Sequence, residues 1–197
     1  MLWRRVIPIS VTFIVSGLTS LLIWQWLAVG CLWWECVDSG IFEPQEIQLP
    51  RDFFPDEAAY GSLGPEHTAY GAKQHHAQQI FWDEPNNYIS TAILDVYRYF
   101  GLYGAQKRYS SLVRIFGDFY TSSDKDNSLK YESISADQLF IKCGEMKPPL
   151  GYRCTFIARY GEDLISLSMT VGEQMTLKDF EQIITYLDTV SAERLGH

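Results

Sequence analysis

Residues 152–171 read YRCTFIARYGEDLISLSMTV, and this stretch decides the fold. Its first half, Tyr152 to Tyr160, is rich in aromatic and β-branched side chains, which favour strands. From Ile165 onward apolar residues alternate with serine and threonine, the period of a strand with one apolar and one polar face. A turn beginning at Gly161 joins the two halves. The stretch therefore predicts a β-hairpin with one buried face, whose polar face is open to a ligand or to water.

A helix is expected directly after this hairpin, from Thr176 to Leu195. Thr176 can cap its first turn, and Asp179 is favourable there because the helix dipole is positive at that end. An apolar stripe follows at helical spacing, formed by Leu177, Phe180, Ile183, Ile184, Leu187 and Val190. We expect this stripe to lie across the buried face of the sheet.

A second hairpin is predicted upstream. Residues 79–83 (QIFWD) and 88–99 (YISTAILDVYRY) have strand composition, and the Glu-Pro-Asn-Asn sequence between them is typical of a turn. In residues 101–116 the apolar positions change from strand spacing to helical spacing, which predicts an amphipathic helix. Its apolar positions recur every three or four residues, at Ala105, Tyr109, Leu112, Val113 and Phe116.

Short strands are expected at residues 130–134 and 138–143, after a polar loop at 121–128. Cys143 and Cys154 would lie on neighbouring antiparallel strands, so they can form a disulfide in an oxidising compartment. The order of elements predicts an α+β domain, with a mostly antiparallel sheet and two packed helices behind an N-terminal transmembrane helix.

The transmembrane helix is predicted by residues 6–29, which contain no charged side chain. A helix of this length spans about 36 Å, enough for a hydrocarbon core of about 30 Å. Arg4 and Arg5 favour a cytoplasmic N-terminus, and a tryptophan cluster ending at Trp34 suits the membrane interface at the exit. We therefore expect a single-pass protein, with its C-terminal domain outside the cytoplasm.

Three fates of this N-terminal segment are open. It can stay as an uncleaved signal-anchor, which its length favours, or it can be a cleaved secretory signal, whose apolar region usually runs only about 7–15 residues. The third fate is lipidation at Cys31, because residues 28–31 (AVGC) resemble a bacterial lipobox, with alanine where leucine is expected.

Three regions are expected: an anchor or signal at 1–31, a tether leading into the domain at 32–78, and the extracytoplasmic domain at 79–197. Prolines interrupt the tether, and its histidines, His67, His75 and His76, have no recognised metal-ligand spacing, so a solvated loop is favoured. The formal net charge of −8 argues against binding nucleic acid. An apolar fraction of 47% predicts a packed core.

No catalytic motif accompanies these elements. The chain has no G-x-S-x-G, H-E-x-x-H or P-loop sequence, and neither cysteine pair has C-x-x-C spacing. The acidic residues at 118–127 lack the ligand pattern of a calcium loop. The sequence therefore predicts a protein that is not an enzyme and that holds no cofactor or metal.

Several short motifs carry a family resemblance over residues 78–195. They are QIFWD at 79–83, VYRY at 96–99 followed by Ala105, the Cys143 and Cys154 pair, ARYG at 158–161 and MTLKDF at 175–180. With these motifs the chain resembles membrane-anchored or lipoprotein-like extracytoplasmic bacterial proteins. Its layout is also similar to the Mog1/PsbP type of fold. The resemblance implies a fold and a location, and it transfers no active-site residue.

These observations favour a membrane-tethered binding or accessory domain. The alternative is a structural single-pass subunit of a larger membrane complex, because small residues around Gly17 allow close helix packing. Besides the membrane, the expected partner is another membrane protein. The candidate partner surface comprises Trp82, Lys107, Arg108 and Arg114.

Overall fold

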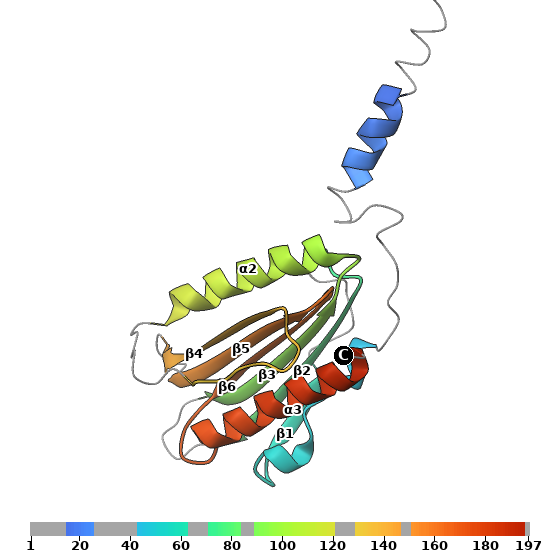
Figure 1. Cartoon of the computed structure of the whole chain (residues 1–197). Coiled ribbons are helices and arrows are strands. Elements are labelled where there is room, and N and C mark those ends of the chain that lie inside the picture. The colour runs from blue at the N-terminus through green and yellow to red at the C-terminus, as the bar shows by residue number, and fades with distance from the viewer. Residues whose placement is uncertain are drawn as a thin grey trace, which may run out of the picture.

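The computed structural model describes residues 15–25, 43–62, 71–83, 89–120, 129–146 and 151–195. These ranges contain an α+β fold built on one six-stranded antiparallel sheet (Figure 1). The strands are β1 (Ala59–Ser62), β2 (Gln74–Asp83), β3 (Ile89–Arg98), β4 (Gln138–Glu145), β5 (Tyr152–Tyr160) and β6 (Asp163–Thr170). The main helices are α2 (Leu102–Phe119) and α3 (Leu177–Leu195), and two short 3-10 turns, η1 (Pro44–Glu46) and η2 (Arg51–Phe53), precede β1.

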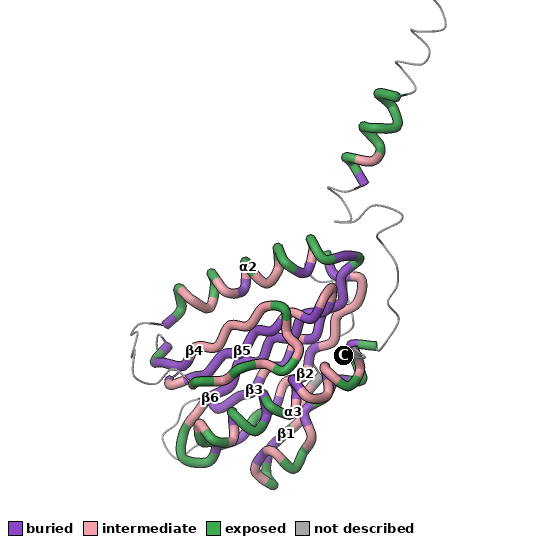
Figure 2. Tube along the Cα trace, in the orientation of Figure 1, coloured by how far each residue is buried: buried purple, intermediate pink, exposed green. Residues whose placement is uncertain are grey.

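The predicted hairpin of β5 and β6 is confirmed and lies inside the sheet. The strand order is β1-β2-β3-β6-β5-β4, so β6 pairs with β3 on its other side and joins the two halves of the sheet. Every residue of β6 is buried (Figure 2). The prediction of only one buried face was therefore wrong, because the serine and threonine face is also covered.

Helices α2 and α3 cover opposite faces of the sheet (Figure 1). Alternate residues of each strand point to opposite faces, so each helix meets its own set of side chains. In β5, for example, Phe156 belongs to the core beneath α3, whereas Ile157 belongs to the core beneath α2. The molecule therefore has three layers, with the sheet in the middle.

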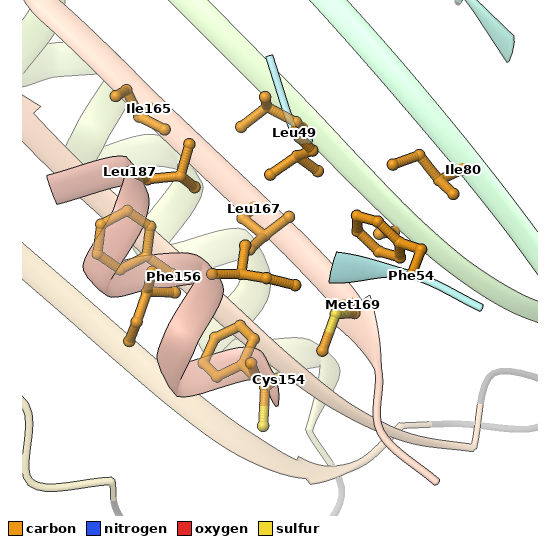
Figure 3. Packing of buried hydrophobic residues seen from close by; sticks show 14 of the residues in the cluster. Leu49, Phe54, Ile80, Cys154, Phe156, Ile165, Leu167, Met169 and Leu187 are labelled. Atoms are coloured by element: carbon orange, nitrogen blue, oxygen red, sulfur yellow. The ribbon is translucent and has the colours of Figure 1, made fainter. Parts of the chain in front are cut away.

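The face beneath α3 holds the larger core. Figure 3 shows Phe156, Leu167 and Met169 of the central strands gathered with Leu187 of α3. The predicted apolar stripe of α3 supplies the other side, with Phe180, Ile183 and Ile184 all fully buried. The predicted cap is also present, since Thr176 and Asp179 hydrogen-bond to each other's side chain and backbone.

The face beneath α2 has a smaller apolar core. Ala105 and Leu112 of α2 pack with Tyr97, Ile157 and Leu164 of the sheet. This cluster lies where β3 and β5 end and β6 begins. Farther along the same face, β6 carries Ser166, Ser168 and Thr170, so apolar packing gives way to polar side chains.

Two segments differ from the expected elements. Residues 59–62 of the predicted tether form the edge strand β1, and β2 begins at Gln74 rather than at residue 79. Conversely, residues 130–134 form no strand. Instead, the buried Asp188 side chain of α3 accepts hydrogen bonds from this segment, including the Ile134 N–H at 2.7 Å. That N–H is consequently not free for a strand partner.

Residues 15–25 are helical, inside the predicted span at 6–29. No helix in the described ranges is long and apolar enough to cross a membrane. The rest of the predicted span and Cys31 lie outside the described residues.

The predicted disulfide joins Cys143 of β4 to Cys154 of β5. The two residues are directly opposed in the ladder, with Cα atoms 4.1 Å apart. Both side chains are buried beside the core under α3. The bridge therefore fastens the edge strand β4 to its neighbour β5.

Replacing both cysteines with serine should lower the free energy of unfolding by about 2–3 kcal/mol, because the bridge closes a loop between residues 11 apart. Urea unfolding with and without reductant tests this, since reductant should destabilise the native chain and leave the serine variant unchanged. Peptide mapping that found Cys143 and Cys154 as free thiols in the unreduced protein would contradict the bridge itself.

Candidate ligand-binding groove

A groove of about 420 Å³ lies on the α2 side of the sheet. Its size is within the range of pockets that bind small molecules. Four strands supply its floor and the end of α2 supplies a wall. The lining residues are Gln79, Thr91, Ile93, Asp95, Phe116, Phe119, Met146, Arg153, Ser166 and Ser168.

The strand register brings these side chains together from distant parts of the sequence. One row across the sheet runs from Gln79 through Ile93 to Ser168, which are successive partners on β2, β3 and β6. In the next row Asp95 faces Ser166. Because side chains two residues apart on a strand share a face, both rows open into the same groove.

Arg153 of β5 forms the polar centre of one end. Its side chain is buried, and each N–H of the guanidinium has an acceptor. Nε donates to Ser168 Oγ at 3.3 Å, and Nη1 donates to Thr91 Oγ1 at 3.0 Å and to Thr170 Oγ1 at 2.9 Å. Nη2 donates to the backbone oxygens of Thr91 and Ser168.

No carboxylate balances this charge within the described part of the chain, because all five acceptors are neutral oxygens. Burial lowers the pKa of Arg153 to about 10, and Tyr120 acts in the opposite direction. The guanidinium therefore stays charged at neutral pH. A buried charge without a counter-ion is costly, so this residue is unusual for a purely structural core.

The hydroxyl groups of Thr91 and Ser168 connect the Arg153 guanidinium to the groove. Thr91 Oγ1 and Ser168 Oγ each accept an N–H from Arg153, which leaves their own O–H groups as donors. Hydrogen bonds in such a chain polarise one another, so these hydroxyls become stronger donors. Behind them, the Tyr120 hydroxyl lies 2.7 Å from Thr155 Oγ1, and burial raises the pKa of Tyr120 to about 12.

The other end of the groove is acidic. Asp95 Oδ1 accepts a hydrogen bond from Nε2 of His75 at 2.8 Å. Ser166 and Gln79 line the floor beside it, and neither side chain has a hydrogen-bond partner in the described structure. These groups are therefore available to a ligand.

Apolar side chains form a wall of the groove. Phe116 and Phe119 come from the last turns of α2, Ile93 from β3 and Met146 from the residue after β4. Phe119 is 45% exposed, although it lies beside the groove. The wall is thus suited to an apolar surface that is partly open to solvent.

His75 and Asp95 do not form a catalytic triad with a described residue. The His75 ring stacks on Tyr97, with centroids 4.4 Å apart, and its one side-chain hydrogen bond is to Asp95. No serine or threonine hydroxyl in the described ranges lies within hydrogen-bond distance of His75. The pair therefore orients the Asp95 carboxylate. The described residues also contain no group of three side chains that could hold a metal ion.

The four residues of the predicted partner surface do not share one exposed surface. Trp82 is only 4% exposed and packs against Phe54, so its assignment to a surface was wrong. Its alternation on β2 directs it to the α3 face, where the core covers it. Lys107 and Arg114 are exposed on α2, and Arg108 lies over the Tyr97 ring at 5.3 Å. None of these four residues lines the groove.

The sequence pattern found the polar face of β6 and missed Arg153. A signal was present, because Arg153 is charged and lies in a strand otherwise rich in apolar and aromatic residues. Its hydrogen-bonding partners come from β3 and β6, however, so only the sheet register brings them to it.

No protein-family model, curated protein or solved structure matches this chain. The resemblance to membrane-anchored or lipoprotein-like extracytoplasmic proteins, and to the Mog1/PsbP type of fold, therefore stays a prediction.

Proposed function

We propose that this chain is a membrane-tethered binding domain that holds a small ligand, or a short part of a partner, in the groove beside α2. The observation that carries the proposal is the groove floor, where Gln79 and Ser166 offer hydrogen-bonding groups with no described partner. Their polar atoms line a groove of ligand size and are not among the sealed, unpartnered atoms of the described core, so a ligand in the groove can hydrogen-bond to them.

The tether is part of the same proposal. The uncharged run at residues 6–29 supports attachment to a membrane, and the two arginines before it support a domain outside the cytoplasm. Cys143 and Cys154 support an oxidising compartment, because disulfides persist there and are rare in the cytosol. The domain would then bind its ligand close to the outer surface of that membrane.

Filling the groove should abolish ligand binding. Ser166→Leu places a larger side chain on the groove floor, whereas Ser110→Leu makes the same change at an exposed position of α2 that does not line the groove. In a ligand-observed NMR screen of a fragment library, the native chain and Ser110→Leu should bind the same fragments. Ser166→Leu should lose them. Equal binding by all three proteins, or no binding by the native chain, would contradict the proposal.

The alternative role, a structural subunit of a membrane complex, has its own support in the exposed apolar side chains of α2, among them Leu102 and Ile115. Mild detergent extraction followed by size measurement separates the two roles. A binding module should run as a small monodisperse particle, whereas a structural subunit should co-migrate with other membrane proteins.

A further inference from the structure

The two ends of the groove carry opposite charge. Arg153 and its hydroxyls lie at the end near Thr91, and the Asp95 carboxylate lies at the other end. Thr91 and Asp95 are four residues apart on β3, which corresponds to about 13 Å along a strand. The groove thus has a basic end and an acidic end, with the apolar Ile93 between them on β3.

The end near Arg153 has one positive charge and no described negative partner. A single negative charge from a ligand would balance it. The guanidinium donates all of its N–H groups to protein oxygens, so the ligand would contact the hydroxyls of Thr91 and Ser168 instead. These hydroxyl donors suit an oxygen anion, and the guanidinium behind them stabilises its charge.

The other groups of the groove narrow the choice of anion. A highly charged ligand such as a phosphate ester would leave charge uncompensated, since Arg153 is the one cation among the residues that line the groove and the other charged lining residue, Asp95, is acidic. The protein as a whole is acidic as well. The Phe116 and Phe119 rings favour a ligand with an apolar or aromatic body.

We propose that the groove binds an amphipathic organic monocarboxylate, with its carboxylate beside Thr91 and Ser168 and its apolar body against Phe116 and Phe119. Asp95 and Ser166 accept a hydrogen-bond donor at the far end of longer ligands. This assignment rests on the proposed binding function and adds the chemical class of the ligand.

The assignment can be tested with 3-phenylpropionate and its neutral amide, 3-phenylpropionamide, which have nearly the same shape. Titration calorimetry on the full chain in lipid nanodiscs should show the carboxylate binding at least about tenfold more tightly than the amide, a difference of about 1.4 kcal/mol. In Arg153→Gln the two probes should bind equally, because the charge that favours the carboxylate is gone.

A matched pair at the groove wall gives a second test that does not disturb the buried arginine. Phe119→Glu and Phe119→Gln each replace a partly exposed ring. The two new side chains have the same size as each other and differ in charge. Relative to the native chain, the affinity for the amide should fall by the same factor in both variants. The carboxylate should bind several-fold more weakly to Phe119→Glu than to Phe119→Gln, because like charges repel.

The outcomes of these experiments distinguish a wrong ligand class from a wrong binding function. If acid and amide bind equally to the native chain, the monocarboxylate assignment is overturned and the groove remains a binding site. A carboxylate preference that survives Arg153→Gln also overturns the assignment, as does equal carboxylate binding by the two Phe119 variants. If neither probe binds and the fragment screen is also empty, the binding function itself fails.

Discussion

Replacing Asp188 with alanine should lower the free energy of unfolding by about 3–5 kcal/mol. The buried Asp188 carboxylate accepts four hydrogen bonds, from Tyr131 Oη at 2.9 Å, Ser133 Oγ at 2.6 Å, the Ile134 N–H at 2.7 Å and Tyr160 Oη at 2.8 Å. Removing it leaves several partly buried donors without an acceptor. Burial and the carboxylate both raise the pKa of Tyr131 and Tyr160, so these hydroxyls remain protonated donors at neutral pH.

Glu193→Ala is the matched control for Asp188→Ala, because Glu193 is an exposed acid on the same helix. It should change the stability by less than about 0.5 kcal/mol. Urea unfolding followed by circular dichroism measures both variants. A loss of less than about 1 kcal/mol for Asp188→Ala would show that Asp188 does not fasten residues 131–136 to α3.

Phe156→Ala should lower the free energy of unfolding by about 3–5 kcal/mol, because it removes a fully buried ring from the core beneath α3. The ring lies between the central strands and α3, beside Leu167 and Leu187 (Figure 3). The strands on both sides of β5 are held by backbone hydrogen bonds, so the site cannot collapse fully around the cavity.

Phe119→Ala is the matched control, because it removes the same ring at a position where the ring is 45% exposed. It should lower the free energy of unfolding by less than about 1 kcal/mol. The midpoint and slope of urea unfolding, measured for both variants, check the comparison. Similar losses for the two rings would contradict the assignment of the core to the α3 face. A small loss for Phe119→Ala would also show that groove-wall variants stay folded for binding experiments.

Local patterns predicted several elements well. The hairpin of β5 and β6 and the helix α3 have clear apolar periods, and the structure contains both. The Thr176 cap and the disulfide were also predicted correctly, because each depends on residues close in sequence or on a single strand pairing. The edge strand β1 was missed, since only four residues form it and they lie in the segment expected to be an irregular tether.

The error at residues 130–134 has a different cause. The composition of this segment suits a strand, but tertiary contacts outweigh local propensity. The Asp188 carboxylate, more than 50 residues away in sequence, accepts hydrogen bonds from Tyr131, Ser133 and the Ile134 N–H. Nothing near residue 130 in the sequence indicates this partner.

By itself, the sequence determined which segments form the central hairpin and α3, and which of their faces is apolar. Those properties follow from the spacing of side chains along one element. Only the tertiary structure decided that α2 covers the polar face of β6 and that Thr91, Arg153, Ser166 and Ser168 share one groove. The reason is physical: the groove depends on the register between strands and on the packing of a helix above them, and residues far apart in the chain set both.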